Sequence, residues 1–381
     1  MRKFLLISAL FFSILSFGQF ETIDKKMSEM PDSFASSTAA IAGYISQNFT
    51  TDDDKIRAVF YWTVSTISYD VENMFNQPPN QSVDYKIKST LETKKGVCMH
   101  YAEVFKDIAN KVGVKTVIID GYTKQDGIIA KIGHSWNASK VNGVWFLFDP
   151  TWGSGYVADQ HYYRKLNNTY FKADVISFGL SHMPFDYLWQ LKEYPISNQE
   201  FYDNKTASAS TEKFDFNAEI EKNENLTNLE RAIALANRLE KSDVKNSLIS
   251  DKIVASKKEI AYYKEIGAIG KLETIVPQFN AATNQLNDFI RFRNNKFIPA
   301  ISDEDLKNKL QIPFELITKY QKEVDTITVS KENTANLISL KKSIVATKKI
   351  ADNQMTFLKE YLSKDQDSRN KMFFKIKVVK R

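Results

Sequence analysis

Hydrophobic positions in the first third of the chain recur with the period of an amphipathic helix. Apolar residues fall every three or four positions in three segments, which predicts helices over residues 36–49, 51–70 and 98–112. Residues 51–54 begin the second helix with a hydroxyl and three carboxylates, groups that satisfy free N–H groups and the positive end of the helix dipole. Gly113 ends the third helix. We expect residues 20–32 to be extended or irregular and residues 71–86 to form a loop.

The period changes from a helical to a strand pattern in the next part of the chain. Three apolar segments predict strands over residues 114–122, 134–141 and 144–148. Asn142 and Gly143 separate the last two strands, and Asn-Gly in this position is a strong signal for a two-residue hairpin. Paired positions then sum to about 285, so His134 lies level with residues 150–151. Antiparallel strands packed against the 98–112 helix make this part an α+β layer structure.

Beyond Pro195 the strand signals disappear and helical patterns follow one another. The sequence predicts helices over about 227–241, 245–268, 270–297, 303–327 and 331–363, punctuated by Gly267, Gly270, Pro299 and Pro313. Residues 372–381 alternate lysines with apolar residues, which is typical of a strand or a basic tail. The economical interpretation of this half is a helical bundle or a coiled-coil-like domain. We therefore predict an α+β domain over residues 19–200 and an all-α domain over residues 201–381.

The first eighteen residues have the pattern of a secretory signal peptide. Arg2 and Lys3 precede a mostly apolar run over residues 4–17, and small residues at its end suit cleavage after Gly18. The run is shorter than the ~20 apolar residues that a membrane-spanning helix needs. We therefore expect a cleaved signal peptide over residues 1–18 and export to the periplasm or the extracellular space.

Composition narrows the chemistry that the chain can perform. The 381 residues are 43% hydrophobic and 26% charged, which is typical of a globular protein, and include one cysteine and four histidines. A single cysteine excludes an internal disulfide, a CxxC redox pair and a cysteine-rich zinc site. The scattered histidines offer little for a metal site, so we expect no metal and no other cofactor. In an oxidising environment a lone thiol is a liability unless it is buried or used.

Charge differs between the two halves of the chain. Residues 201–381 carry 32 basic and 25 acidic residues, whereas residues 1–200 carry 20 basic and 21 acidic ones. The two signs alternate along the predicted helices, which is the pattern of a solvated face. An exported protein seldom meets nucleic acid, so we expect no nucleic-acid partner. The basic helical half favours an acidic partner at the cell envelope.

Three residues combine into a candidate catalytic group. Cys98 begins a predicted helix, where the dipole and free backbone N–H groups stabilise a thiolate. His134 begins one strand of the hairpin and Asp149 follows the other, so both lie at the same end of it. A thiol, an imidazole and a carboxylate in line are the nucleophile, base and orienting group of thiol catalysis. Each also has a structural alternative: a small buried residue, a strand-end histidine bonded to the backbone, and a turn aspartate before Pro150.

Four sequence blocks resemble the transglutaminase-like superfamily. They are Gly96-Val97-Cys98-Met99-His100-Tyr101-Ala102, Gly121-Tyr122, His134-Ser135-Trp136-Asn137, and the segment from Asn142 to Gly153 with Asp149-Pro150-Thr151-Trp152. The segment that begins at His182 is similar to the one after the core in kyphoscoliosis-peptidase-type members, and the resemblance covers about residues 36–200. It implies a papain-like thiol fold with Cys98 as nucleophile, His134 as base and Asp149 as the third member. Members of the superfamily include cross-linking acyltransferases, peptidases, amidases and proteins that have lost activity.

The resulting hypothesis is an exported cysteine peptidase or amidase that cleaves amide bonds in a protein or peptide substrate through a thioester. Trp136 and Trp152 are expected to line its cleft, and the backbone N–H of Cys98 is the natural first oxyanion donor. One alternative is a protein-cross-linking acyltransferase, although the calcium sites and β-domains of the animal enzymes have no visible counterpart in this sequence. The other is a non-catalytic binding or scaffold protein of the cell envelope, in which the helical half does the work.

Overall fold

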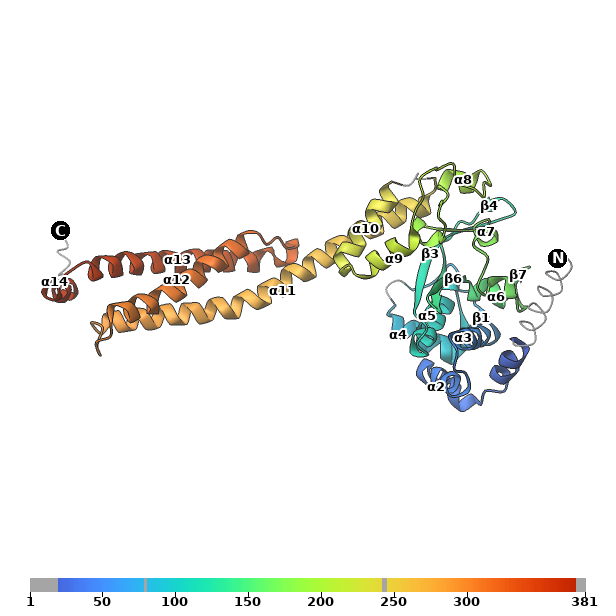
Figure 1. Ribbon diagram of the computed structural model, residues 1–381, viewed down its shortest axis with the longest axis horizontal. Coiled ribbons are helices and arrows are strands. Elements are labelled where there is room, and N and C mark those ends of the chain that lie inside the picture. The colour runs from blue at the N-terminus through green and yellow to red at the C-terminus, as the bar shows by residue number, and fades with distance from the viewer. Residues whose placement is uncertain (1–19, 79–80, 242–244, 375–381) are drawn as a thin grey trace, which may run out of the picture. The chain divides into compact units, whose positions relative to one another are not determined.

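The computed structural model describes residues 20–78, 81–241 and 245–374. The chain divides between Lys257 and Lys258 into two compact units (Figure 1). The predicted signal peptide and the end of the predicted basic tail, from residue 375, lie outside the described residues. Within the described ranges, no helix combines the length and the apolar composition that crossing a membrane requires.

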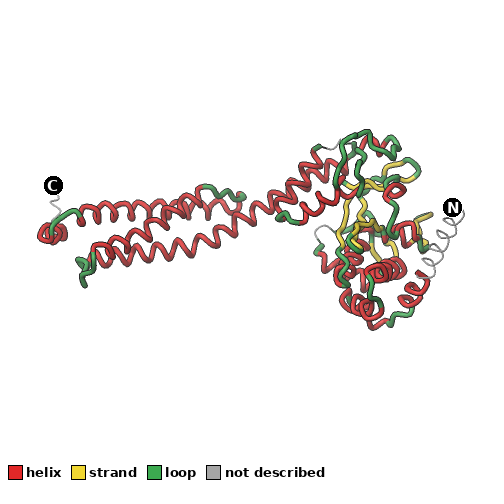
Figure 2. Tube along the Cα trace, in the orientation of Figure 1, coloured by secondary structure: helices red, strands yellow, loops and turns green. Residues whose placement is uncertain are grey.

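The first unit combines short helices with short strands (Figure 2). Its helices are α2 (Thr38–Asn48), α3 (Asp52–Thr66), α4 (Val83–Thr93), α5 (Cys98–Lys111), α6 (Pro150–Ser154), α7 (Val175–Phe178), α8 (Asn198–Tyr202), α9 (Phe216–Glu224) and α10 (Asn228–Glu240). Its strands are β1 (Ser68–Tyr69), β2 (Lys95–Gly96), β3 (Thr116–Gln125), β4 (Ile128–Ile129), β5 (His134–Val141), β6 (Val144–Phe148), β7 (Gly155–Ala158), β8 (His161–Arg164) and β9 (His182–Pro184). The α+β class predicted for this part is confirmed.

The N-terminal helices follow their sequence signals except at the very start. The Thr51 side chain accepts a hydrogen bond from the backbone N–H of Asp54 and so caps α3, as predicted. Residues 20–32 were expected to be extended or irregular, but residues 20–28 are helical. The reason is tertiary: the Asp24 carboxylate accepts two hydrogen bonds from the fully buried guanidinium of Arg57, at 2.8 and 2.5 Å. Side chains on this helix also bury themselves in the core.

The predicted hairpin forms with the predicted register. Strands β5 and β6 pair antiparallel from Asn137 opposite Phe148 to Val141 opposite Val144. The turn residues Asn142 and Gly143 have φ angles of 50° and 84°, the left-handed conformation that a two-residue hairpin of this type requires. The side-chain positions at the open end of the hairpin, where the candidate residues lie, therefore follow from the sequence pattern.

A strand that the sequence did not predict completes the sheet. The strand order is β4-β3-β5-β6. Strand β9 also pairs with β3, along the edge opposite β5. Gly121 of β3 lies opposite His134 of β5 and also opposite Pro184 of β9. A Cβ atom at Gly121 would lie 2.2 Å from the carbonyl oxygen of Met183 and 2.5 Å from the Trp136 ring, so only glycine fits this crossing.

Apolar side chains of the helices and the sheet form the main core of the first unit. Phe60 of α3, Phe105 of α5 and Phe148 of β6 are fully buried, and the rings of Phe105 and Phe148 lie 5.4 Å apart. Helix α5 packs against α2, α3 and α4 and against β5. This contact fixes the helix that begins at Cys98 relative to the strand that begins at His134.

The first compact unit continues beyond the predicted domain boundary at residue 200. Ile220 of α9 packs in the same apolar cluster as Trp136 and Leu147 of the sheet. Nε of Arg238 in α10 lies 2.7 Å from Oδ1 of Asp186. Helices α9 and α10 therefore belong to the first unit, because Ile220 of α9 packs in its apolar cluster and Arg238 of α10 pairs with its Asp186.

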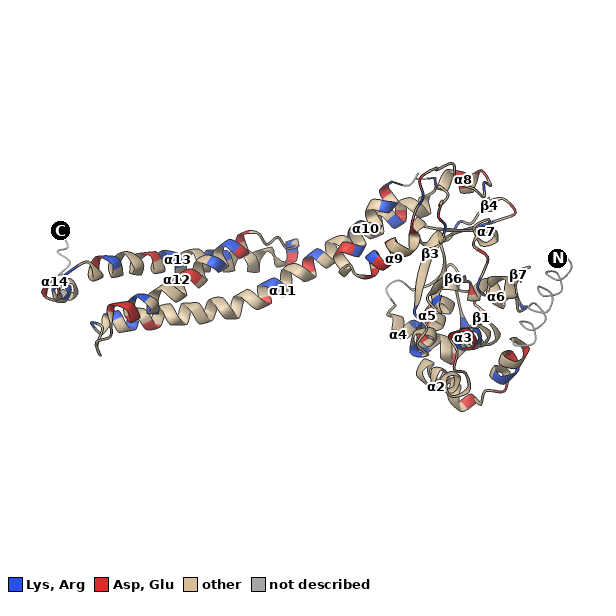
Figure 3. Cartoon of the chain, viewed as in Figure 1, with Lys and Arg blue, Asp and Glu red and all other residues tan. Residues whose placement is uncertain are grey.

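The second unit is helical throughout its described residues. It contains most of α11 (Ser247–Asn294), which begins in the first unit, and α12 (Asp303–Asp325), α13 (Thr334–Leu362) and α14 (Gln366–Lys371). The all-α class predicted for the C-terminal part is confirmed. Gly267 and Gly270 were expected to separate two helices, but α11 runs through both, because its neighbouring Ala268 and Ile275 are buried in a shared apolar cluster. Basic and acidic residues are interspersed along the exposed helix faces (Figure 3).

Candidate active site

The thiol lies where a short strand becomes a helix. Cys98 is half-buried and is the first residue of α5, as predicted. Parallel pairing of β1 with β2 places Tyr69 opposite Gly96, two residues before the thiol. The N–H of Val97 donates a hydrogen bond to Nδ1 of His100, which holds the chain as it enters the helix. The first N–H groups of a helix have no helical acceptor, so this position suits a group that becomes negative.

His134 and Asp149 meet at the open end of the hairpin. Nε2 of His134 lies 2.8 Å from Oδ2 of Asp149. Both side chains are buried, and Asp149 is completely so. Oδ1 of Asp149 accepts hydrogen bonds from the backbone N–H groups of Thr151, at 2.8 Å, and Trp152, at 3.1 Å. The start of α6 therefore holds one carboxylate oxygen and leaves the other facing His134.

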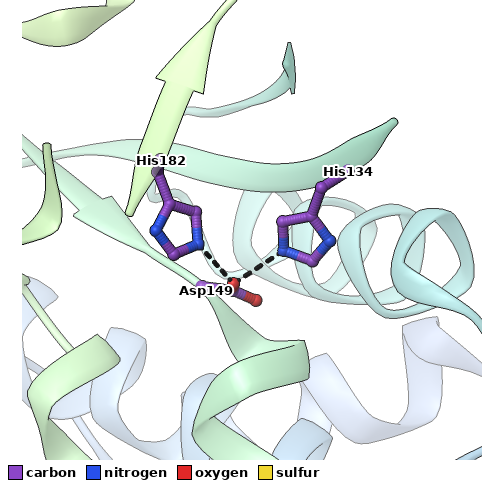
Figure 4. Close-up of side chains that lie close together, drawn as sticks. All are labelled: His134, Asp149 and His182. Carbon is purple, nitrogen blue, oxygen red and sulfur yellow. Dashed lines mark hydrogen bonds and ion pairs between the residues drawn. The ribbon is translucent and has the colours of Figure 1, made fainter. Parts of the chain in front are cut away.

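A second imidazole, which the sequence interpretation left out of the site, binds the same oxygen. Nε2 of His182 lies 3.0 Å from Oδ2 of Asp149, so both rings point at one carboxylate (Figure 4). Nδ1 of His182 lies 2.8 Å from the hydroxyl of Ser181, and its ring stacks on Phe178 with centroids 3.9 Å apart. The sequence did contain a signal for His182, because the segment that begins there resembles the superfamily. Its place in the site depends on the pairing of β9 with β3, which the sequence pattern did not predict.

Strand pairing explains why two histidines far apart in sequence converge. Gly121 of β3 pairs with His134 on one edge, and Thr123 of the same strand pairs with His182 on the other edge. Residues two apart on a strand point to the same face, so their partners on the neighbouring strands share that face too. The sheet therefore presents both imidazoles to Asp149.

In His134, Asp149 and His182, burial shifts the pKa against the charged form, and interactions with the neighbouring groups shift it the other way. Burial by itself lowers the pKa of His134, but the Asp149 carboxylate and Cys98 outweigh it and raise that pKa to about 10. Burial opposes ionisation of Asp149, but the charge of His134 and the bonds from both imidazoles hold its pKa below the usual range. Burial lowers the pKa of His182, and Asp149 offsets this only in part. At neutral pH, Asp149 is thus an anion between a protonated His134 and a neutral His182.

His134, Asp149 and His182 are also the described residues whose ligand atoms lie close enough together for a metal ion. A metal ligand nitrogen must have lost its proton. Here both Nε2 atoms face a carboxylate oxygen at hydrogen-bond distance, so each carries a proton, and the raised pKa of His134 strengthens that state. Metal binding and this hydrogen-bonded arrangement exclude each other, and the arrangement fits the proton chemistry of a thiol site better.

Cys98 and His134 open onto one cleft of about 780 Å³. Its walls come from the segment after β1, the loop between β4 and β5, the start of α6 and the β7–β8 hairpin. The lining residues are Tyr69, Met74, Phe75, Cys98, Thr123, Gln125, Ala130, Lys131, Ile132, Gly133, His134, Thr151, Trp152, Gly155, Tyr156, Val157, Tyr162, Lys165, Leu166, Asn167 and Tyr170. A volume of this size accommodates several residues of an extended peptide or a comparable ligand.

The two tryptophans expected in the cleft have different environments. Trp152 lines it, and its ring lies 5.8 Å from the His134 ring. Trp136 is 1% exposed and is not among the lining residues. Its ring packs instead against His134, Phe178 and His182 inside the first unit. The prediction therefore stands for Trp152 and is corrected for Trp136.

Tyr69 lines the same cleft as Cys98 and carries a phenol hydroxyl. Burial raises the pKa of Tyr69 above its usual range, and the nearby charges of Cys98 and Asp149 raise it further. The phenol therefore keeps its proton at all physiological pH values. A hydroxyl in this state donates a hydrogen bond to an anionic group in the cleft.

Part of this chain is similar to known proteins. Residues 39–150 match the family model described as the transglutaminase-like superfamily. The chain is 29% identical over 197 residues to kyphoscoliosis peptidase of Homo sapiens and 30% identical over 193 residues to that of Mus musculus. These matches cover 48% and 47% of this chain but 29% of the length of each relative.

A solved structure described as the crystal structure of a TGase is 16% identical, covers 40% of this chain and 37% of its own, and has a TM-score of 0.25. The range that matches the family model, residues 39–150, contains Cys98, His134 and Asp149. Residues 39–150 are therefore similar to the transglutaminase-like superfamily, and the order of the sequence blocks and the α+β architecture of this part agree with that likeness.

Proposed function

We propose that this protein is an exported cysteine hydrolase, a peptidase or amidase, that cleaves amide bonds in peptides or proteins. The observation that carries the proposal is the buried His134–Asp149 pair, which lies behind the cleft that Cys98 lines. A buried carboxylate costs free energy unless it is fully hydrogen-bonded, and this one accepts four hydrogen bonds. A buried, fully hydrogen-bonded carboxylate beside a histidine is the arrangement expected of a catalytic site.

In the first half of the reaction, the Cys98 thiolate attacks the carbonyl carbon of the scissile amide and a C–S bond forms. The carbonyl oxygen takes the negative charge. The C–N bond then breaks, and His134 donates its proton to the leaving nitrogen, which leaves a thioester on Cys98 and a free amine. A pKa of about 10 keeps His134 protonated for this step at neutral pH.

In the second half, neutral His134 removes a proton from water and the water oxygen attacks the thioester carbon. The C–S bond breaks, the acid product leaves, and the pair of thiolate and imidazolium is restored. Hydrolysis needs no acceptor site other than one for water. We therefore favour it over transfer to an amine.

Asp149 and His182 act through His134. Oδ2 of Asp149 holds Nε2 of His134, which leaves Nδ1 as the ring nitrogen for the thiol. His182 donates to the same oxygen, and so restrains the carboxylate from a second direction. We assign Asp149 and His182 the role of positioning residues. Asp149 contacts His134 and two backbone N–H groups, and His182 contacts Asp149.

Two donors are available for the negative oxygen of the intermediate. The backbone N–H of Cys98 lies at the start of α5, and the Tyr69 hydroxyl lines the same cleft. Loss of one oxyanion donor costs about 10²-fold or more in kcat. Tyr69→Phe removes the hydroxyl and keeps the ring, so we expect kcat to fall by about this factor with little change in KM.

The first experiment needs no substrate, because the chain has one cysteine. The rate of Cys98 alkylation by iodoacetamide is measured against pH in the wild type, in His134→Ala and in His161→Ala. His161 is exposed and does not line the cleft, so it is the matched control. A free cysteine is half ionised near pH 8.5. We expect fast alkylation at pH 6–7 in the wild type and in His161→Ala, and much slower alkylation in His134→Ala.

The second experiment adds a quenched-fluorescent peptide library, with Cys98→Ala as the comparison. Cleavage by the wild type and none by Cys98→Ala supports the hydrolase. Equal alkylation rates in all three proteins at pH 6–7, or equal cleavage by Cys98→Ala, would overturn the proposal. Export is tested separately: the protein recovered from outside the cytoplasm should begin at Gln19.

A further inference from the structure

The cleft differs in charge from the half of the chain that builds it. Residues 1–200 carry slightly more acidic than basic side chains. The cleft lining nevertheless includes two lysines, Lys131 and Lys165, and none of its described residues is an aspartate or a glutamate. His134 adds no net charge to the cleft, because its positive charge is paired with the Asp149 carboxylate at 2.8 Å. The electrostatic character of the cleft is therefore a local feature and does not follow from overall composition.

The backbone holds both lysines at the cleft. The N–H of Ala130, next to Lys131, donates to the carbonyl oxygen of Thr123, at 2.9 Å. The N–H of Lys165 donates to the carbonyl oxygen of Ser154, also at 2.9 Å. The two lysines come from separate walls, one before β5 and one after β8. Two separate segments of the chain therefore each contribute a lysine to the cleft lining.

Neither lysine has its charge neutralised by a carboxylate within the described residues. By contrast, the ammonium group of Lys252 lies 2.8 Å from Asp120. Asp70 and Asp126 are adjacent in sequence to lining residues, and Asp159 lies two residues from Val157, but none of these three carboxylates lines the cleft. Asp70 accepts hydrogen bonds from the amide of Asn73, and the other two occupy the outer turns of the β3–β4 and β7–β8 hairpins.

The same walls present exposed apolar and aromatic surface. Tyr156, which lines the cleft, is 54% exposed and stacks on Tyr163 with ring centroids 5.5 Å apart. Phe75, on the wall after β1, is 72% exposed. An aromatic ring held by stacking offers contact area at low entropic cost. The cleft thus combines apolar walls with unpaired positive charge.

We propose that the cleft selects peptides that carry a carboxylate close to an apolar or aromatic residue at the cleaved bond. The inference rests on the proposed hydrolase function and names its substrate class. The carboxylate is that of an aspartate or glutamate side chain or that of the peptide's C-terminus. The same charge disfavours the ammonium group of a lysine, which is the acceptor that protein cross-linking requires.

The test uses the single thiol as a charge probe, independently of catalysis. Two methanethiosulfonates of similar size are compared, the 2-sulfonatoethyl anion and the 2-(trimethylammonio)ethyl cation. In each, the Cys98 thiolate forms a disulfide bond with the reagent sulfur and methanesulfinate leaves. The ratio of anion to cation rate is measured by mass spectrometry and divided by the ratio for the urea-unfolded chain, which removes the intrinsic reactivity of the reagents.

We expect the folded wild type to favour the anion over the unfolded chain. Lys131→Glu and Lys165→Glu should each lower the ratio by about two- to fivefold, the range of exposed charge interactions. Lys258→Glu makes the same charge change on an exposed residue outside the cleft lining and should leave the ratio unchanged. Added salt should reduce the preference, because it screens exposed charges. A folded ratio equal to the unfolded one, or equal effects of all three substitutions, overturns the inference.

A peptide arm separates this inference from the proposed function. Matched peptides with an aromatic residue at the cleaved bond carry a neighbouring Glu, Gln or Lys, each with a free or an amidated C-terminus. Higher kcat/KM for Glu over Gln assigns the carboxylate to a side chain, and loss on amidation assigns it to the C-terminus. Cleavage without either preference leaves the hydrolase intact and overturns the inference. Anion-selective labelling without any cleavage supports the charge selectivity and counts against the hydrolase.

Discussion

The two units of this protein bury different kinds of side chain. Every buried polar or charged residue in the described part of the chain lies at or before Ser256. The apolar cluster of the second unit, which includes Leu286, Phe289 and Leu310, is built from aliphatic and aromatic side chains. Burying a polar group costs free energy unless each hydrogen bond is replaced. Folding of the first unit therefore carries a cost that the second unit avoids, and buried His134, Asp149 and His182 are among the residues responsible.

This comparison separates a unit organised around chemistry from one organised around packing. In the first, Asp149 accepts four hydrogen bonds and fixes two imidazoles. In the second, charge stays at the surface, as in the pair of Arg369 with Asp303, whose side chain is 54% exposed. Removing one carboxylate from each unit should therefore have very different consequences.

The largest effect is expected from Asp149→Asn. The amide has a single acceptor oxygen, which cannot serve both the two imidazoles at Oδ2 and the two backbone N–H groups at Oδ1, so His134 loses its orientation. We expect kcat to fall by about 10⁴-fold and the free energy of unfolding to fall by about 3 kcal/mol or more. Both are measured on purified protein, by peptide cleavage and by urea denaturation. Asp303→Asn is the matched control and should cost at most about 1 kcal/mol; equal losses in the two variants would remove the distinction between the units.

Leu310→Ala tests whether the second unit is stabilised by packing alone. Leu310 is fully buried in the apolar cluster of that unit. Truncation should lower its stability by about 2–5 kcal/mol through lost contacts and a residual cavity. The rate of Cys98 alkylation at neutral pH should not change. A large drop in that rate would mean that the thiol depends on the packing of the second unit.

His182→Phe removes the second bond to Oδ2 of Asp149 and keeps an aromatic ring on Phe178. We expect a loss of about 1–3 kcal/mol, because a buried acceptor loses a donor, and a lower kcat with KM little changed. His182→Gln can still donate to the carboxylate and should recover part of kcat. If the glutamine variant recovers nothing, the imidazole acts by its shape and not by its hydrogen bond.

The pH dependence of stability should show the two histidines with opposite signs. The pKa of His134 is raised from 6.5 to about 10, so its contribution is complete below pH 6.5 and is lost as the pH rises towards 10. The pKa of His182 is lowered, so the unfolded chain takes up a proton below pH 6.5 that the folded chain refuses, and stability falls as the pH falls. The lowered pKa of Asp149 adds to the acid-side loss.

Denaturation midpoints between pH 4.5 and 10 separate these contributions. His134→Gln should flatten the decline on the alkaline side, and His182→Gln should flatten it on the acid side. We expect these changes in the pH dependence of stability to be smaller than the changes in kcat and in the free energy of unfolding predicted above. A curve with the same shape in all three proteins would show that neither imidazole differs in protonation between the folded and the unfolded chain.

Local signals in the sequence were enough for much of the site. The Asn142-Gly143 turn and the alternation around it set the register, and the register places His134 beside Asp149. The helix start at residue 98 likewise follows from periodicity. These features depend on neighbours within a few residues or across one tight turn, where geometry leaves few choices.

Other features depended on contacts between distant segments. Residues 20–28 are helical because Asp24 finds Arg57, and Gly267 and Gly270 lie within one helix because the residues beside them are packed. The unit boundary at Lys257 instead of residue 200 has the same origin, since Ile220 and Arg238 find partners in the first unit. Propensity is a weak signal, and tertiary contacts override it.

By itself, then, the sequence determined the likeness of residues 39–150 to the transglutaminase-like superfamily and the α+β and all-α classes of the two parts. It also singled out Cys98, His134 and Asp149 as candidates. Only the tertiary structure decided that His182 shares the carboxylate, that Trp136 is buried, and that Lys131 and Lys165 line one cleft. The physical reason is the pairing of β9 with β3 and the approach of two loops that are not neighbours in sequence. Such long-range pairings are stabilised by the burial of side chains from the whole unit, so no short segment of the sequence predicts them alone.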